Sequence, residues 1–460
     1  MNNSLLNPQT FSRAAAQEVA LGCLSDLVEL ARSSGADAAD GVMVSGDALS
    51  ASQRLGARED LERSESADIG LRVIVGKKQA NVSSTDTSPS AYDRLVQRAL
   101  SMAENALEDP HCGLADPALL VETLPDLELF DSEEPSTELL FDWAANAEEA
   151  ALSVNGVSNS EGANATWGRT TFALVTSGGF SGAYTTSRYG VSVSVLAGSG
   201  ASMQRDFDFS TACHVVDLED PLVVGLSAGE RAVRRLEARK VPTAQVPVVF
   251  DWRVANSLLR HLSGAINGNS IARETSFLKG QLGKKVFSSG IEVIDDPLRA
   301  RGLLSRPCDG EGVRTKTLPI VRDGVLQNWL LDTRTAKQLC LSSTGHASRS
   351  VGGPPAPSSS NFYLRPGSIN PDELISDIDS GFYVSELIGY GVNLVTGDYS
   401  RGASGFWIEN GKICYPVHEL TIAGNLTEMF QTLQPANDLT FRTGTDSPTV
   451  RVDGMTVAGL

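Results

Sequence analysis

The sequence has few cysteines, and no two of them are spaced as metal ligands. Six thiols lie far apart along 460 residues, without a CxxC pair. Such spacing is typical neither of a disulfide framework nor of a zinc knuckle. A nucleophilic cysteine would need a histidine that the fold brings to it, because no local spacing supplies one. We therefore expect reduced thiols at Cys23, Cys112, Cys213, Cys308, Cys340 and Cys414.

Basic residues are also scarce, since 38 Lys and Arg residues face 56 Asp and Glu residues and the net charge is -18. This excess of negative charge repels phosphate backbones. The densest cationic stretch, at 231–240, lies near the end of a predicted helix, where cations suit the helix dipole. Its charged residues are Arg231, Arg234, Arg235, Arg239 and Lys240. We therefore expect no nucleic-acid partner.

Long apolar runs are missing as well. No stretch of eighteen apolar residues occurs, and the N-terminal sequence MNNSLLNPQTFSRAAAQEV lacks a basic segment followed by an apolar one. The sequence therefore predicts neither a membrane span nor a signal peptide, and we expect a soluble cytoplasmic protein.

Aromatic residues make up only 6% of the chain, whereas glycine occurs 43 times. This balance indicates many tight turns and a strand-rich fold. Because one core stops growing well below 460 residues, two or three domains are expected. We assign an N-terminal domain to residues 1–240, with an exposed, proline-rich connection near 109–136, and a C-terminal domain to residues 241–460.

The N-terminal half combines helical and alternating patterns. Apolar residues recur at helical spacing from about 11 to 34, and short alternating segments follow at 40–56 and 60–75. A meander of strands is predicted between about 155 and 215, closed by a helix at about 225–240. This half is therefore predicted to be an antiparallel sheet with flanking helices.

The C-terminal half is dominated by hairpin signals. A short apolar strand at 245–250 ends at Asp251, which is a good N-cap for the helix after it. Asp323-Gly324 and Asn410-Gly411 are each flanked by alternating apolar residues, as in tight hairpins. The stretch GGPPAPSSS at 352–360 is predicted to be a loop or flap. The fold class is therefore α+β, with a mostly β C-terminal domain.

No local motif for catalysis is complete. The sequence has no GxSxG or SxxK motif and no P-loop. His418-Glu419 would need a histidine at Ile422 to form HExxH. The helix containing LLRHLSGA at 258–265 has the frame of a zinc-peptidase helix but lacks the necessary pair of histidines.

Two acidic residues, Asp309 and Glu311, lie close together in the glycine-bracketed segment RPCDGEGVRTKT. Two carboxylates at this spacing could bind a cation or position a water molecule in a cavity. Acidic residues in such a loop are more often turn formers. Both interpretations stay open at the level of sequence.

Several segments, in order along the chain, resemble the TldD/PmbA family of peptidases, once called modulators of DNA gyrase. The first is SADIGLRVIVGKKQANVSSTD at 66–86. The others are DGEGVRTKTLPIVRDGVLQNWLLDTRTAKQL at 309–339, STGHASR at 343–349, NLVTGDYSRGASGFWIENGKICYPVHELTIAGNL at 393–426 and SPTVRVDGMTVAGL at 447–460. Because these matches are long and ordered, the resemblance covers most of the chain.

The resemblance implies a family of two kinds. One kind carries a helical HExxxH zinc motif and a further cysteine ligand near the C-terminus, and the PmbA or TldE kind lacks these ligands. Here Arg260 stands at the first histidine position, His261 at the glutamate position and Ala265 at the second histidine position. No cysteine follows Cys414. The resemblance therefore implies the TldE kind, without a metal site or catalytic residues of its own.

The resemblance also implies a role. TldE-type chains pair with a zinc-bearing TldD-type chain, and the pair degrades or trims unfolded peptides. We therefore expect zinc in the partner subunit, activity only together with that subunit, and a homodimer as an option when the chain is alone. Two alternatives stay open: a peptide-binding or regulatory adaptor without a part in hydrolysis, and an autonomous hydrolase that uses Asp309, Glu311 or a recruited thiol.

Overall fold

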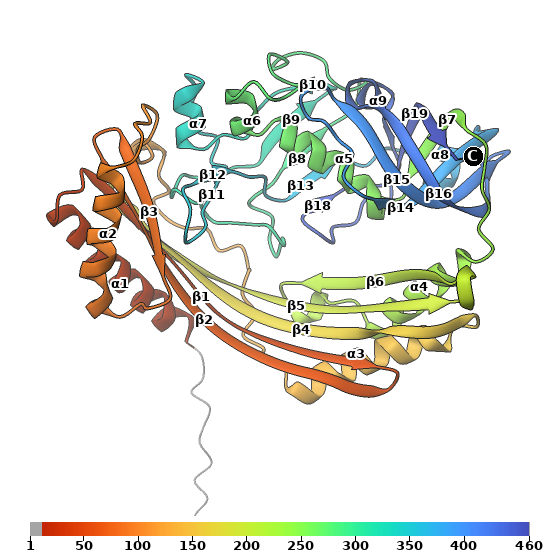
Figure 1. Ribbon diagram of the computed structural model, residues 1–460, viewed down its shortest axis with the longest axis horizontal. Helices are drawn as coiled ribbons and strands as arrows, with labels where there is room; N and C mark the ends of the chain where they lie inside the picture. Colours follow the sequence, from red (N-terminus) through yellow and green to blue (C-terminus); the bar gives the residue numbers. More distant parts are fainter. Residues whose placement is uncertain (1–11, 460) are drawn as a thin grey trace, which may run out of the picture.

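The structure, a computed structural model, describes residues 12–459. It has the α+β architecture that the sequence predicts, with a long antiparallel sheet on one side and a second, strand-rich region facing it (Figure 1). The elements of the N-terminal half are α1 (Arg13–Ser33), β1 (Ala38–Arg54), β2 (Ala57–Val75), β3 (Lys78–Ser84), α2 (Tyr92–Glu104), α3 (Thr137–Ser153), β4 (Val157–Thr176), β5 (Ser181–Ala197), β6 (Gln204–Ala212) and α4 (Pro221–Arg234).

The N-terminal sheet has six strands in the order β3-β2-β1-β4-β5-β6, and every neighbouring pair is antiparallel. Successive side chains of a strand point to opposite faces. Odd-numbered residues of β1 and β4, such as Met43 and Trp167, pack in the two cores formed with α1 and α2 and with α3 and α4. The helices thus cover one face of the sheet, and even-numbered residues form the opposite, concave face (Figure 1).

Strands β1 and β2 are longer than the sequence predicts, with 17 and 19 residues, and a tight turn at Leu55-Gly56 joins them. The first part of β2, at 57–66, is exposed on both faces and consists mainly of charged and small residues. A strand with two solvated faces has no apolar alternation to reveal it. The alternation of apolar and polar residues in β2 is therefore found only in its second part, which packs on the core.

The helix predicted at about 225–240 begins earlier and ends earlier, because α4 covers Pro221–Arg234. Asp220 caps its N-terminus and Pro221 occupies the first turn. Beyond the helix Glu237 has a φ of 61°, and the backbone of Arg239 bonds to Pro416. The tertiary contact with the second region therefore removes the end of the predicted stretch from the helix.

The C-terminal half contains two sheets. The elements are β7 (Ala244–Phe250), α5 (Trp252–Ala265), α6 (Gly268–Ala272), β8 (Val293–Asp295), β9 (Leu318–Arg322), β10 (Val325–Leu326), α7 (Thr333–Gln338), β11 (Ala347–Ser348), β12 (Ala356–Pro357), β13 (Phe362–Leu364), α8 (Pro371–Ile375), β14 (Ser380–Ile388), β15 (Asp398–Glu409), β16 (Lys412–Asn425), α9 (Leu426–Thr432), β17 (Gln434–Pro435), β18 (Thr445–Asp446) and β19 (Val450–Ala458). Pairing of β16 with both β15 and β19 closes the ring β16-β15-β14-β7-β19.

The second sheet of this half has the order β10-β9-β8-β13-β18. Helix α5 packs between the two sheets, and its buried residues join one core with both of them: Ala255, Leu258, Leu259, Leu262 and Ala265. Asp251 caps α5 through the backbone N–H of Arg253, as predicted. The predicted hairpins are confirmed too, because both residues of each turn, Asp323-Gly324 and Asn410-Gly411, have positive φ.

The C-terminal half contacts the N-terminal sheet in several places. On the concave face Val42 and Leu174 pack with Cys308. At the edge strand β6, Arg253 of α5 binds Asp206 at 2.7 Å. Between these two places Arg188 of β5 donates to the carbonyl oxygen of Leu303 at 2.6 Å.

Residues 346–360, which we call the strap, form another contact between the halves. Strands β11 and β12 pair to make the base of the strap. At its tip the backbone of Val351 lies directly on Gly70 of β2, where any Cβ would overlap with the carbonyl group of Val351. The stretch expected to be a loop or flap is therefore a packed hairpin that reaches across to the sheet.

A buried ion cluster fixes the strap to the sheet. Asp40 of β1 lies between Arg72 of β2 and Arg349 of the strap, and all three side chains are buried. Arg349 reaches Asp40 at 2.7 Å and also donates to Asn81 at 3.0 Å. One carboxylate thus pairs with two arginines that come from opposite halves of the chain.

Other expectations concern the thiols and the chain's N-terminus. All six cysteines are free. In the described part of the chain, no helix combines the length and apolar character that a bilayer span needs. The expected lack of a signal peptide, and the start of the first predicted helix at residue 11, lie in part outside the described residues.

Candidate site around helix α5

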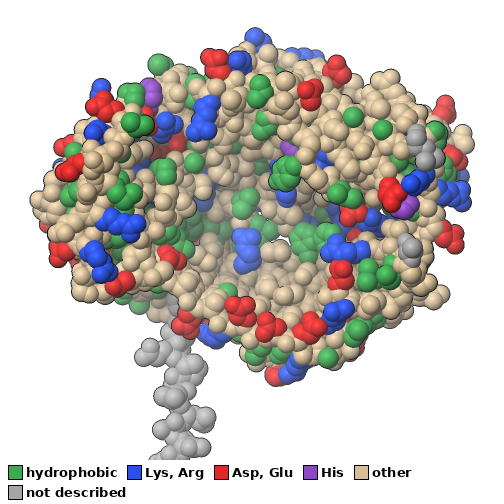
Figure 2. Space-filling view, in the orientation of Figure 1, with side chains coloured by type: hydrophobic (Ala, Val, Ile, Leu, Met, Phe, Trp, Pro, Cys, Tyr) green, Lys and Arg blue, Asp and Glu red, His purple; other side chains and the backbone are tan. Residues whose placement is uncertain are grey.

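A hollow lies between the concave face of the N-terminal sheet and the C-terminal half (Figure 2). The floor of the hollow includes even-numbered residues of β1 and β4, among them the exposed Ala48, Thr166 and Thr170. These side chains are small and uncharged. Lysine and arginine side chains are also visible inside the hollow (Figure 2).

Helix α5 borders the hollow. Its residues Trp252, Arg253 and Asn256 line a cavity of about 220 Å³ together with Phe207 and Phe209 of β6. Residues three, four and seven positions apart lie on one face of a helix. Arg260 follows Arg253 by seven positions and Asn256 by four, and it is exposed. The face of α5 that borders the cavity therefore continues to Arg260.

The three positions of the degenerate metal motif have different surroundings. Arg260 is exposed, His261 is partly buried and Ala265 is buried in the core. The ring of His261 contacts the ring of Tyr399 edge to face, with 6.0 Å between the ring centroids. Tyr399 and Arg401 lie two positions apart on β15, so their side chains point to the same side of that strand.

Several polar atoms in this place are buried without a hydrogen-bond partner in the described residues. They are Oγ of Ser257, Nε2 of His261, the hydroxyl group of Tyr399 and Nε of Arg401. Ser257 precedes His261 by one helical turn and shares its face of α5. Most buried polar groups in proteins have a partner, because an unpaired group loses its hydration without compensation. This cluster is therefore an exception that needs an explanation.

The charge states of the cluster follow from burial and from the two arginines. Burial and, to a smaller extent, the positive charges of Arg401 and Arg260 together lower the pKa of His261 to about 4. Burial raises the pKa of Tyr399, although Arg401 opposes that shift. At neutral pH the imidazole of His261 is therefore uncharged, and the hydroxyl group of Tyr399 keeps its proton.

The depressed pKa of His261 predicts a loss of stability in acid. The folded state takes up the proton near pH 4 and the unfolded state near pH 6.5, so the unfolded state binds more protons in between. Stability that is complete above pH 6.5 is then lost as the pH falls, by about 2 kcal/mol at pH 5. Urea unfolding of wild type and of His261→Gln at pH 7 and pH 5 measures this loss, which the variant lacks. A His418→Gln control is expected to lose as much stability between pH 7 and pH 5 as wild type. An equal loss in all three proteins would contradict the assignment of this loss to His261.

The unpaired hydroxyl group of Tyr399 can be tested against a paired one. Tyr399→Phe removes a buried donor without a partner, so we expect the free energy of unfolding to stay constant or to rise by up to about 1 kcal/mol. Tyr189 is also fully buried, but its hydroxyl group donates to the carbonyl of Glu133. Tyr189→Phe therefore lowers the same quantity by about 1 kcal/mol. Similar losses in both variants would show that Tyr399 has a partner.

Asp309 and Glu311 lie in the interior, with 1% and 5% of their surface exposed. Asp309 accepts hydrogen bonds from the backbone N–H groups of Glu311, Val313 and Ala347 at 2.8–3.1 Å. Glu311 accepts one from the backbone of Thr333 at 2.8 Å. Burial and the charge of Asp309 raise the pKa of Glu311 to about 7. The two carboxylates thus organise the turn through these backbone contacts.

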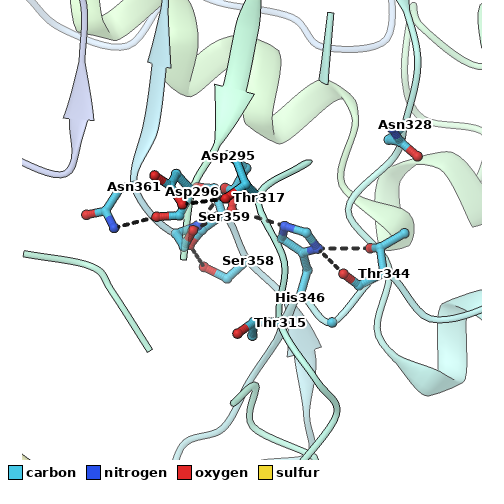
Figure 3. A network of polar contacts seen from close by, with 12 residues as sticks. Asp295, Asp296, Thr315, Thr317, Asn328, Thr344, His346, Ser358, Ser359 and Asn361 are labelled. Carbon is cyan, nitrogen blue, oxygen red and sulfur yellow. Dashed lines mark hydrogen bonds and ion pairs between the residues drawn. The ribbon is translucent and has the colours of Figure 1, made fainter. Parts of the chain in front are cut away.

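A second polar network lies at the base of the strap (Figure 3). Asp295 of β8 faces Nε2 of His346 at 3.1 Å, and it accepts hydrogen bonds from the hydroxyl and backbone N–H groups of Ser360. Nδ1 of His346 lies 2.9 Å from the carbonyl oxygen of Thr344. Asp295, His346 and Ser360 are all buried, with 0–1% of their surface exposed.

This network resembles a catalytic triad only in its residue types. In a triad the histidine stands between serine and aspartate, so that it can take the proton of the serine. Here the aspartate stands between the other two, because Asp295 faces His346 (Figure 3) and accepts a hydrogen bond from Ser360. His346 is therefore not placed to activate Ser360, and the network ties both ends of the strap to β8.

Comparison with known proteins assigns the family. Family models match residues 39–103, 130–236 and 243–459 as PmbA/TldA metallopeptidase domain 1, central domain and C-terminal domain. The metalloprotease PmbA of Escherichia coli O157:H7 is 37% identical over 95% of both chains. This chain belongs to the PmbA/TldD metallopeptidase family. A metalloprotease TldD homolog of Haemophilus influenzae is more distant, with 27% identity over 57% of this chain and 58% of its own.

Solved structures of the family share the fold. A proposed modulator of DNA gyrase from Bacteroides thetaiotaomicron superimposes with a TM-score of 0.88 and 25% identity, over 95% of this chain and 98% of its own. TldE from Thermococcus kodakarensis gives a TM-score of 0.82 over 95% and 99% of the two chains. Because its identity is 22%, this second likeness concerns the fold only.

A metallopeptidase family implies a metal ion, and the residues at this helix do not fit one. Zinc needs at least three protein donors in catalytic sites. Of the three motif positions only His261 offers a donor atom, Ala265 offers none, and Arg260 carries a permanent positive charge that repels a cation. Among residues 12–459 no group of three His, Cys, Asp or Glu side chains is placed to hold a metal ion.

Sequence reasoning found the helix but missed most of the cluster around it. Ser257 could have been found, because it stands four positions before His261. Tyr399 and Arg401 come from a strand far along the chain, and no spacing connects them with α5. Asp295 and His346 were likewise missed as a pair, since strand β8 and the strap meet only in the folded chain.

Proposed function

We propose that this chain is the subunit without a metal site in a two-chain cytoplasmic zinc metallopeptidase, which degrades or trims unstructured peptides. The zinc ion is held by a TldD-type partner chain. The observation that carries the proposal is the state of α5: the helix keeps its place beside the hollow, but its ligand positions hold Arg260 and Ala265. The whole family scaffold is thus kept around a helix that supplies one donor atom.

The hollow supports peptides as the substrate class. Part of its floor, at Ala48, Thr166 and Thr170, presents small, uncharged side chains, which select weakly among peptide sequences. An extended peptide exposes all its main-chain groups, whereas a folded protein does not. A chamber of this kind therefore suits unstructured peptides of varied sequence.

An exposed apolar loop beside α5 supports a partner chain. The loop between β14 and β15 packs Leu394 against Gly264 of α5. Nearby it exposes Ile388, Tyr390 and Val395, and the side chain of Tyr390 is completely accessible. Large apolar side chains that gather on a surface mark contact sites for other proteins. The proposal places the TldD-type chain against this loop.

Reconstitution tests the subunit role. The full-length chain, the TldD-type protein of the same cell, and their mixture are compared by metal analysis, native mass measurement and hydrolysis of an unfolded peptide. We expect zinc and activity in the mixture only, with no stoichiometric zinc in this chain alone. One zinc ion per isolated chain, together with activity that His261→Ala abolishes, would overturn the proposal. Native mass measurement of the isolated chain also shows whether it forms a homodimer.

The same assay separates the subunit from an adaptor. If the TldD-type protein hydrolyses the peptide equally well without this chain, the adaptor interpretation replaces ours. A matched pair of variants tests the loop: Tyr390→Ser weakens association, whereas Leu107→Ser, which changes another exposed apolar residue in the N-terminal half, leaves it unchanged. Equal association of both variants with the partner would exclude the loop as its binding site.

A further inference from the structure

Two arginines beside α5 have no counter-charge. Within the described residues, the side chains of Arg260 and Arg401 take part in no ion pair and no hydrogen bond. Some other arginines of this half have acidic partners, for example Arg253 with Asp206 and Arg451 with Asp377. Arg260 adjoins His261 on α5, and Arg401 lies two positions from Tyr399, whose ring contacts that of His261. Two guanidinium groups without an acidic partner therefore border one buried cluster.

The unpaired hydrogen-bond donors meet at the same place. Arg401 and Tyr399 project from one side of β15, and the ring of Tyr399 contacts His261 of α5. Ser257 lies one helical turn before His261. Nε of Arg401 and the hydroxyl groups of Tyr399 and Ser257 are all buried and unpartnered. Tyr399 is only 1% exposed, so bulk water does not solvate its hydroxyl group in the free chain.

The chemistry of these groups selects the ligand. Arginine only donates hydrogen bonds, and the hydroxyl groups are free to donate. Two positive charges oppose a metal cation and favour an anion, and a guanidinium group matches the two oxygens of a carboxylate. A neutral molecule would satisfy the hydroxyl groups but would leave both positive charges without a partner. A carboxylate satisfies both requirements.

We propose that Arg260, Arg401, Tyr399 and Ser257 form a site that binds a carboxylate group of a peptide. Arg260 lies on the face of α5 that borders the hollow, so a peptide in the hollow reaches the site from there. The choice of a peptide as the carrier of the carboxylate rests on the proposed function. The anion preference itself rests only on the residues of this chain.

Three peptides of one neutral sequence test the site on the full-length chain by calorimetry. The first has a C-terminal carboxylate, the second a C-terminal amide, and the third an amide together with one internal glutamate. Because hydrogen bonds to charged groups are the strong ones, we expect the preferred carboxylate peptide to bind roughly 10-fold more tightly than the plain amide. Whether the first or the third peptide is preferred identifies the source of the carboxylate.

Variants test whether Arg260, Arg401 and Ser257 cause the preference for a carboxylate. The double variant Arg260→Gln and Arg401→Gln reduces the 10-fold difference to less than about twofold, while its circular dichroism stays that of wild type. Ser257→Ala removes one donor and no charge, and it reduces the difference less. The control Arg322→Gln, on an exposed arginine of β9, keeps the full difference.

Equal binding of all three peptides to wild type would overturn the site, as would a preference that survives the double variant. These results are independent of the subunit test. A carboxylate preference in an assembly without activity would leave the site valid and the proposed function wrong. An active complex without the carboxylate preference would leave the proposed function valid and the site wrong.

Discussion

Exchange of Asp40 for asparagine is expected to lower the free energy of unfolding by about 3–5 kcal/mol, because it leaves two buried arginines without a counter-charge. Asp40 bonds to Nε of Arg72 at 2.6 Å and to Arg349 at 2.7 Å. Burial alone would raise the pKa of Asp40, but Arg349 and Arg72 outweigh burial and hold this pKa below its usual range. The carboxylate is therefore charged at neutral pH, and asparagine keeps the shape of the side chain without its charge.

The midpoint of urea unfolding measures this effect. Asp377→Asn is the matched control, because Asp377 also pairs with an arginine, Arg451, but has 71% of its side chain exposed. Exposed ion pairs contribute little to stability, so the control stays close to wild type. A loss of similar size in both variants would contradict the role of burial. Since Arg349 belongs to the strap, we also expect faster proteolysis of residues 350–355 in Asp40→Asn.

Asp295→Asn is expected to lower the free energy of unfolding by about 3 kcal/mol, because charge-assisted hydrogen bonds to two buried groups are lost. The carboxylate of Asp295 holds His346 (Figure 3) and Ser360, which are the two ends of the strap. An amide has one acceptor oxygen, so at least one buried donor loses its partner. Burial would raise the pKa of Asp295, but His346 and Ser360 keep it below its usual value.

Hydrogen exchange of the strap and urea unfolding check this expectation. We expect faster exchange throughout 346–360 in Asp295→Asn, together with the loss of stability. Asp296→Asn is the control, since Asp296 is only partly buried and binds Thr317 away from the strap. Unchanged exchange in the strap of Asp295→Asn would show that β11 and β12 hold it without the network.

Local elements could be predicted where local chemistry decides them. Asp251 caps α5 because its side chain accepts from a backbone N–H two positions on, a contact that depends on neighbouring residues only. The turns at Asp323-Gly324 and Asn410-Gly411 likewise follow from residues that tolerate positive φ. The length of β2 could not be predicted, because the first part of this strand has solvent on both faces. The early end of α4 could not be predicted either, because it depends on a contact with Pro416.

Of the candidate site, too, only a part could be predicted from the sequence. The sequence by itself determined that the helix at 252–265 offers only one possible metal donor, because the side chains of Arg260 and Ala265 have none in any fold. Only the tertiary structure decided that Tyr399 and Arg401 lie beside His261 and that Asp309 and Glu311 are enclosed. The physical reason is distance along the chain: the chemistry of a side chain is local, whereas its neighbours depend on strand pairing and packing between residues far apart in sequence.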